Sequence, residues 1–327
     1  MEAPLSREEL IEKIEMCDSV SNVNTSLITD MSKLFCVDTS KKIYRGASFN
    51  QPLNDWDVSN VTTMKEMFSG ASSFNQPLND WDVSNVKDMN DMFYYAYSFN
   101  QSLNNWDVSN VKNMGGMFWG AKSFNKLLDK WDVSNVKDMN AMFFGATSFN
   151  QPLNSWDVSK VKDMHGMFYC ATSFNQPLNN WDVLKVEDMG RMFQNATSFN
   201  QPLNNWNVSK VKNMSSMFDN AKSFNQPLND WDVSNVEYMI SMFAGAKNFN
   251  QPLNDWDVSK VECIDGMFDG AKRYTYSFKT WKLNSCFSIF NFLKDCNLWH
   301  LVNTVEDLPM QKGKRIDSED KKVWKLL

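Results

Sequence analysis

The sequence has few of the residues that carry catalysis or metal binding. Its 327 residues include only two histidines and six cysteines. The cysteines lie at no metal-ligand or redox spacing, and so few of them exclude a disulfide scaffold. The histidines, His165 and His300, stand near no recognisable nucleophile motif. We therefore expect no enzyme, no cofactor and no metal centre.

Long apolar runs and an excess of positive charge are absent as well. No segment approaches the roughly 18 apolar residues of a membrane span, and the N-terminal residues lack the apolar core of a secretory signal. The formal net charge of −6 argues against a nucleic-acid-binding surface. We therefore expect an intracellular monomer that binds neither nucleic acid nor membrane.

What the sequence has instead is a strict tandem repeat. A tryptophan recurs every 25 residues from Trp56 to Trp281. Such a period is typical of a solenoid, in which each unit stacks on the one before. We predict an N-terminal capping helix and lead-in at 1–27, a partial first repeat with a longer loop at 28–48, nine 25-residue repeats at 49–273, a degenerate closing repeat at 274–300 and a C-terminal tail at 301–327.

Each unit combines two apolar periods. Residues 53–58 have the spacing of a short strand whose tryptophan faces inward. Met64, Met67, Phe68 and Ala71 lie at i, i+3, i+4 and i+7, which is typical of one face of a two-turn helix. Because strands stack at about 4.8 Å and helices at about 8 to 10 Å, the stack bends away from the helices. We predict an α/β solenoid with a parallel sheet on its concave face, short helices on its convex face, and a cap at each end.

Successive units share the pattern Asn60-Val61-Thr62-x-Met64-x-x-Met67-Phe68-x-Gly70-Ala71-x-x-Phe74-Asn75-Gln76-x-Leu78-x-x-Trp81-Asp82-Val83-Ser84. This repeat resembles that of the BspA-type leucine-rich-repeat surface proteins, over roughly residues 28 to 299. The resemblance implies a right-handed, leucine-rich-repeat-like solenoid, display at the cell surface, and a role in adhesion or host interaction.

An acidic ladder is predicted on the concave sheet, interrupted by Asn207. One interpretation is a strip that binds calcium or a basic partner, because carboxylate oxygens suit Ca²⁺. The other is structural, with each carboxylate accepting hydrogen bonds from the following turn or pairing with a lysine. No single unit has the ligand count of a calcium site, which favours the structural interpretation. The ladder consists of Asp57, Asp82, Asp107, Asp132, Asp157, Asp182, Asp232 and Asp257.

An asparagine recurs without exception from Asn50 to Asn250 at the same 25-residue spacing. We predict that it forms an internal ladder of stacked amides that hydrogen-bond the backbone of the neighbouring coil.

Variation between units is the best guide to a binding site. The position after the helix phenylalanine is aromatic in four consecutive units, and further tyrosines lie beside the first of them. On a helical wheel this position faces away from the core, so the rings are predicted to form an exposed stripe on the convex side. The alternative is that the rings fill grooves between the helices. The candidate residues are Tyr94, Trp119, Phe144 and Tyr169, with Tyr95 and Tyr97.

These features predict a non-catalytic repeat scaffold that mediates protein–protein interaction, with a protein as its partner. One alternative is a structural spacer that acts by its length and stiffness and has no specific partner. A weaker alternative is a calcium-binding acidic ladder.

Overall fold

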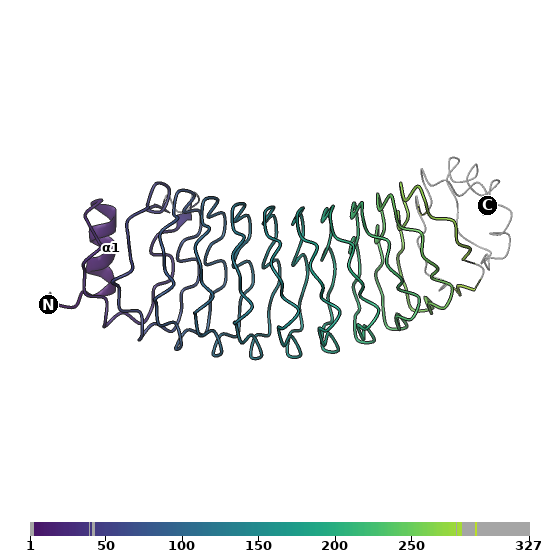
Figure 1. Cartoon of the computed structure of the whole chain (residues 1–327), viewed down its shortest axis with the longest axis horizontal. Helices are drawn as coiled ribbons and strands as arrows, with labels where there is room; N and C mark the ends of the chain where they lie inside the picture. Colours follow the sequence, from purple (N-terminus) through teal and green to yellow (C-terminus); the bar gives the residue numbers. More distant parts are fainter. Residues whose placement is uncertain (1–2, 39, 41–42, 279, 283–291, 293–327) are drawn as a thin grey trace.

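The computed structural model describes residues 3–38, 40, 43–278, 280–282 and 292. The chain forms a single row of stacked coils that bends gently along its length (Figure 1). The solenoid predicted from the 25-residue period is confirmed. The predicted tail at 301–327, and most of the predicted closing repeat at 274–300, lie outside the described residues.

The helix α1 (Arg7–Glu15) stands at the N-terminal end of the row (Figure 1). The predicted N-terminal helix is confirmed, and a capping box begins it: the Ser6 hydroxyl accepts from the amide of Glu9, and the Glu9 carboxylate accepts from the amide of Ser6. Its buried residues, Leu10 and Ile14, pack into the core, so α1 covers the first coil. Among the described residues, no helix has the length and apolar content to cross a lipid bilayer.

Two short strands follow α1, in the longer loop of the partial first repeat. The strands β1 (Val37–Asp38) and β2 (Ile43–Tyr44) pair antiparallel. The amide of Val37 donates to the carbonyl of Ser69 at 2.7 Å, which joins β1 to the first full repeat.

The helices predicted within the repeats do not form in the described residues. The segment that begins at Met64 is a chain of overlapping β-turns, in which Met67, Ser69 and Ala71 each donate to the carbonyl three residues earlier. Two positions four residues apart have positive φ, as at Glu66 (55°), and the pair recurs in all nine repeats. A left-handed residue at every fourth position is incompatible with an α-helix, so the α/β prediction with convex helices is wrong. The pairs are Glu66 and Gly70, Asp91 and Tyr95, Gly116 and Gly120, Ala141 and Gly145, Gly166 and Cys170, Arg191 and Asn195, Ser216 and Asn220, Ser241 and Gly245, and Gly266 and Gly270.

The parallel ladder between coils is formed by this same turn segment. Single-residue parallel bridges link equivalent positions from Asp30 and Thr63 through to Cys263. Within each step, alternate amides donate to the next coil, as Met64 does to the carbonyl of Asp88 at 2.9 Å. Residues 53–58, predicted as the strand, contact the next coil differently, through an indole N–H that donates to a leucine carbonyl. The sheet was therefore predicted in the wrong segment.

The spacing between equivalent groups shows which face is concave. Backbone paired in a parallel ladder repeats at about 4.8 Å. Equivalent rings are 5.5 to 5.7 Å apart in the column that starts at Phe68, and 6.2 to 6.4 Å apart in the tryptophan column. Spacing therefore increases from the ladder toward the tryptophans, so the ladder lies on the concave face and the tryptophan segment on the convex face.

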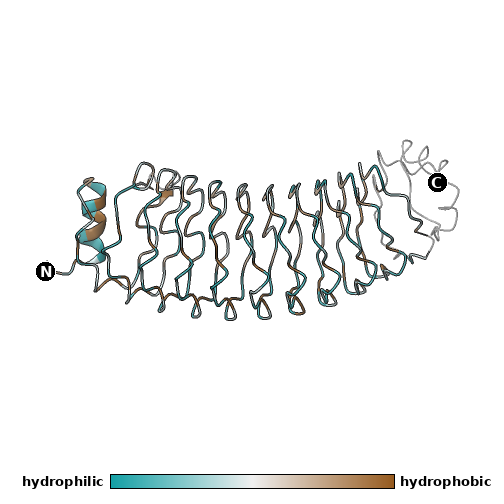
Figure 2. Ribbon diagram, viewed as in Figure 1, coloured by the Kyte–Doolittle hydropathy of each residue, from teal (hydrophilic) through white to brown (hydrophobic). Residues whose placement is uncertain are grey.

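The core consists of columns of equivalent side chains that are identical in most coils, with exceptions such as Ile264 and Tyr274. The tryptophans from Trp56 to Trp281 are at most 4% exposed, and each indole from Trp81 onward donates to the carbonyl of a leucine in the preceding coil, at 2.9 Å from Trp81 to Leu53. The prediction that these tryptophans face inward is confirmed. Along every coil, hydrophobic and hydrophilic residues alternate in short runs (Figure 2), as expected where one side of a thin coil faces the core.

The predicted ladder of amide hydrogen bonds is present, but its asparagines are partly exposed and not internal as predicted. The Asn50 side-chain oxygen accepts from the backbone amide of Asn75 at 2.9 Å, and Gln76 donates to the same oxygen and to the Asn50 carbonyl. The same amide-to-amide bond continues coil by coil to Asn250. This ladder satisfies backbone donors where the coils are too far apart for backbone pairing.

Candidate binding surface

Four aromatic side chains lie side by side across consecutive coils. We call Tyr94, Trp119, Phe144 and Tyr169 the aromatic row. Trp119 and Phe144 stack with ring centroids 4.0 Å apart, Phe144 and Tyr169 stack at 4.1 Å, and Tyr94 lies 5.4 Å from Trp119 at a tilt. All four rings are partly exposed.

The aromatic row lies on the concave face, because its residues belong to the ladder segment. The carbonyl of Tyr94 accepts from Gly70, and that of Phe144 accepts from Gly120. The prediction of a convex stripe is therefore wrong. Its error follows from the helical wheel, which assigned an outward direction to a segment that is not helical.

Tyr95 and Tyr97 extend the row at its first coil. They are 37% and 39% exposed, and the Tyr95 ring lies 4.3 Å from Tyr94 and 5.6 Å from Tyr97. The ammonium of Lys122 lies 4.9 Å from the Tyr97 ring centroid, which is a cation–π contact. A Cβ at Gly120 would overlap the Tyr95 ring, so the glycine of the next coil makes room for it.

Opposite charges stand at the two ends of the aromatic row. The position three residues before each ring is Asp91, Gly116, Ala141 and Gly166, and the next coil has Arg191. Burial, and then the neighbouring charge of Glu66, raise the pKa of Asp91 to about 6. The Arg191 guanidinium is exposed and acts electrostatically on Tyr169, at the opposite end of the row.

One polar atom in the row lacks a partner. The indole N–H of Trp119 is buried and makes no hydrogen bond in the described part of the chain. Burial, and then a hydrogen bond with Tyr95, raise the pKa of Tyr94 to about 12, so its hydroxyl stays protonated at neutral pH.

The predicted acidic ladder lies on the tryptophan side of the coil and not on the concave face, because the strand that was expected to carry it is not part of the ladder. Each carboxylate accepts a hydrogen bond from the backbone amide two residues later, as Asp57 does from Ser59 at 3.0 Å. The hydroxyl and then the amide of Ser84 lower the pKa of Asp82 below its usual range.

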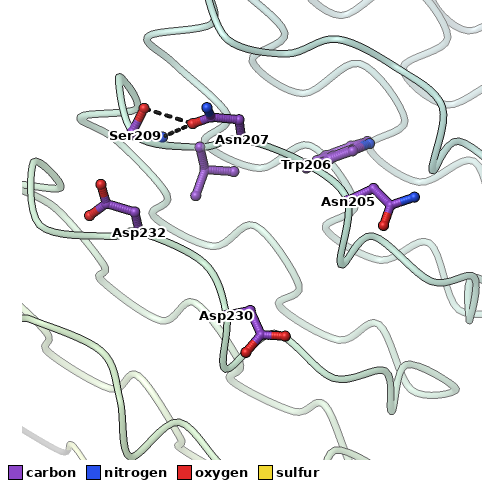
Figure 3. Close-up of a pocket in the computed structure, with 7 residues that line it drawn as sticks. Asn205, Trp206, Asn207, Ser209, Asp230 and Asp232 are labelled. Atoms are coloured by element: carbon purple, nitrogen blue, oxygen red, sulfur yellow. Dashed lines mark hydrogen bonds between the residues drawn. The ribbon is translucent and has the colours of Figure 1, made fainter.

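Asn207 shows that this position does not require a charge. An open hollow between two coils is lined by Asn205, Trp206, Asn207, Val208, Ser209, Asp230 and Asp232 (Figure 3). Within it, the Asn207 amide oxygen accepts from the amide and hydroxyl of Ser209, the same contacts that Asp57 makes. Over the described residues, no group of three or more His, Cys, Asp or Glu side chains is placed to hold a metal ion.

His165 lies on the concave face, and His300 lies outside the described residues. The His165 ring nitrogen Nδ1 is 3.2 Å from Asp188 Oδ1. Burial raises the pKa of Asp188, but hydrogen bonds from His165, Gly190 and Asn213 lower it by more, so the pKa lies below its usual range. Where the chain is described, no hydroxyl or thiol is hydrogen-bonded to this histidine, and no catalytic site is evident.

Sequence analysis did not single out a lysine row on the same face. Lys87, Lys112, Lys137 and Lys162 are exposed and lie in consecutive coils, each amide donating to the carbonyl of the previous one. They occupy the start of the ladder segment in the same coils as the aromatic row. The sequence contained the signal, because one repeat position is lysine in four consecutive units.

Comparison with known proteins identifies the family. A family model described as "Mycoplasma protein of unknown function, DUF285" matches residues 7–131, 101–206 and 191–300. The chain belongs to this family. The description of the DUF285 family gives no activity, and no curated protein matches the chain.

Two solved structures are similar to the chain at low sequence identity. One is the crystal structure of a TLR13–ssRNA13 complex, with 10% identity, a TM-score of 0.24, and coverage of 91% of this chain and 55% of that one. The other is the leucine-rich repeat domain of APL1B, with 9% identity, a TM-score of 0.25, and coverage of 92% and 78%. The chain spans about half the length of the first. No functional argument is built on either likeness.

Proposed function

We propose that this DUF285 protein is a non-catalytic scaffold that binds a protein partner on its concave face, with the aromatic row as the centre of the contact. The observation that carries the proposal is the continuous, partly exposed run of rings from Tyr94 to Tyr169. Aromatic side chains are enriched at the centres of protein interfaces.

The fold itself does not require aromatic residues at this position. Equivalent coils carry Ser69, Asp219, Ala244 and Asp269 there, with the same ladder hydrogen bonds and the same buried core columns. A buried donor without a partner, such as the Trp119 indole, costs about 1 to 3 kcal/mol. A residue that carries this cost where smaller ones are tolerated supports a role in binding.

The alternative is a spacer, in which the rings serve only to brace neighbouring coils. Ring pairs of this geometry contribute about 0.5 to 1.5 kcal/mol each, so bracing is a real contribution. The spacer alternative predicts that removing the rings lowers stability and changes no binding. The roles in adhesion or host interaction rest on the resemblance to BspA-type proteins and are part of this proposal only.

The experiment is a selection of random peptides displayed on phage against the immobilised protein. The variant W119S/F144S removes the centre of the aromatic row, and Ala244→Ser is the matched control, a serine at the same repeat position outside the row. We expect peptides that bind the wild type and Ala244→Ser but lose binding to W119S/F144S, while circular dichroism shows that all three are folded. Selected peptides that bind the three proteins equally, or no selected peptides at all, would contradict the proposal.

A further inference from the structure

The spacing of coils on the concave face selects the kind of segment that can follow the aromatic row. Because spacing decreases toward the concave side, it is about 4.8 Å at the ladder, less than the 5.5 to 5.7 Å of the buried phenylalanine column beneath it, and neighbouring rings of the row lie 4.0 to 5.4 Å apart. An α-helix rises 5.4 Å per turn, which differs from the ladder spacing by only about 0.6 Å per coil. Side chains on one face of a β-strand repeat at about 6.6 to 6.8 Å, which is out of step within two coils. A helix lying along the solenoid can therefore place one side chain on each coil.

The charges at the ends of the row complement a helix in one direction. A helix has a partial positive charge at its N-terminus and a partial negative charge at its C-terminus. The Asp91 carboxylate stands at the Tyr94 end, and the Arg191 guanidinium stands beyond Tyr169. Between them the same position is filled by Gly116, Ala141 and Gly166, all buried, so this position carries no long side chain between the two charges.

The distance between the two charges sets the length of the helix. Asp91 and Arg191 are four coils apart, which corresponds to roughly 20 Å at this spacing. A helix of about 13 residues spans that distance.

We propose that the partner presents an amphipathic α-helix of about 13 residues, which lies along the solenoid on the aromatic row with its N-terminus at Asp91 and its C-terminus at Arg191. This inference rests on the proposed function and adds the class and the direction of the bound segment.

The first test uses a designed probe, a 14-residue peptide of alanine and glutamine with one leucine per helical turn at positions 2, 6, 9 and 13 and with both ends blocked. It carries no charged side chain, so the lysine row cannot attract it. The matched control has proline at position 7, which breaks the helix and keeps every leucine. By fluorescence anisotropy at pH 7.5, we expect the control to bind at least about tenfold more weakly, since proline in a helix interior is strongly unfavourable.

The second test determines direction. A photo-crosslinking benzophenone is placed at the first or last residue of the probe, and the crosslinked protein residues are identified by mass spectrometry. We expect the N-terminal label near Asp91 and the C-terminal label near Arg191. The charge exchange D91R/R191D should weaken binding of the probe in the wild-type direction by about threefold to thirtyfold, because each helix end then faces a charge of the wrong sign. Thermal unfolding checks that this variant is folded, and if it is not, the wild-type crosslinks decide alone.

The outcomes separate the two proposals. The proposed function is contradicted if no selected peptide loses binding to the W119S/F144S variant. If selected peptides depend on those residues but the probe does not bind, tolerates proline or crosslinks in both directions equally, the helical partner is overturned while the binding scaffold stands.

Discussion

Gly120→Ala tests how the Tyr95 ring packs over Gly120 beside the aromatic row. The next coil provides a matched control at Gly145. Gly120 and Gly145 occupy the same repeat position, with φ of 68° and 64°. A Cβ at Gly120 would lie 2.6 Å from Cε1 of Tyr95, inside van der Waals contact. A Cβ at Gly145 would have the Gly120 Cα as its nearest atom, at 3.7 Å. Only the first substitution therefore displaces a side chain.

The expected costs follow from this difference. Both alanines adopt the left-handed conformation, which costs about 1 kcal/mol relative to glycine. At Gly120 the Tyr95 ring must also leave its contacts with Tyr94 and Tyr97, and aromatic pairs of this kind contribute about 0.5 to 1.5 kcal/mol each. We expect losses of about 1 kcal/mol for Gly145→Ala and about 2 to 4 kcal/mol for Gly120→Ala.

Urea unfolding monitored by tryptophan fluorescence measures these losses as shifts in the transition midpoint. The same two substitutions are then made in a Tyr95→Ala background, where the cost of Gly120→Ala should fall to that of Gly145→Ala because the overlapping ring is gone. Equal midpoints for the two alanine variants in the wild-type background would refute the packing of Tyr95 over Gly120. A difference that persists without Tyr95 would show that another contact is responsible.

Three further predictions concern single side chains. Asn150→Ala should destabilise the fold by about 1 to 3 kcal/mol, because the amide of Asn175 loses its acceptor; Asn150→Asp keeps an acceptor oxygen and should cost less, and equal urea midpoints for the two would count against the ladder. Asp91→Asn should be more stable than the wild type at pH 8, by about 1 kcal/mol after allowance for partial exposure. Because burial raises the pKa of Asp91 to about 6, the wild type should gain stability as the pH falls through 6, and the two melting temperatures should converge near pH 4; a constant difference would exclude this cause. Lys126→Gln should stabilise by about 0.5 to 1.5 kcal/mol, because glutamines at this position in other coils donate to the preceding asparagine, here Asn100, and an unchanged midpoint would show that this bond contributes nothing.

The strict period explains how much of the fold could be predicted from sequence. When every coil is the same length, an invariant residue occupies the same environment in each copy. Trp56 and its successors were therefore predictable as a buried column, and Asn50 and its successors as an amide ladder. Both features repeat the same hydrogen bond from coil to coil, so a prediction made for one unit applies to every unit.

The helix was not predictable from apolar spacing alone. The observed turns start at Met64 and Phe68. They direct toward the core the same side chains that a two-turn helix would bury on one face. The information that distinguishes them lies in residues that tolerate positive φ. Glycine or asparagine at the position of Gly70 is typical of a helix end, but Gly116, Gly166 and Gly266 mark a second such position four residues earlier in the unit. Two left-handed positions one helical turn apart exclude a helix.

That error decided the placement of the candidate site. A helix at 64–71 faces the convex side in a solenoid whose sheet is elsewhere, so the aromatic row was predicted there. Once the turn segment is seen to form the ladder, the same rings lie on the concave face, beside the lysine row and between the charges of Asp91 and Arg191. The residues were identifiable from sequence, whereas their common face depended on the backbone.

Departures from the repeat are concentrated in one part of the array. The aromatic row and the lysine row from Lys87 to Lys162 fall in the same four neighbouring coils of the concave face. If these residues served stacking alone, they would recur in all nine repeats, because every interior coil contacts its neighbours in the same way. Coils farther along the chain, with Ala244 in place of a ring, stack with the same ladder hydrogen bonds. The concentration of these two departures on one face therefore argues for a local requirement that stacking does not impose, and the proposed contact with a partner would meet it.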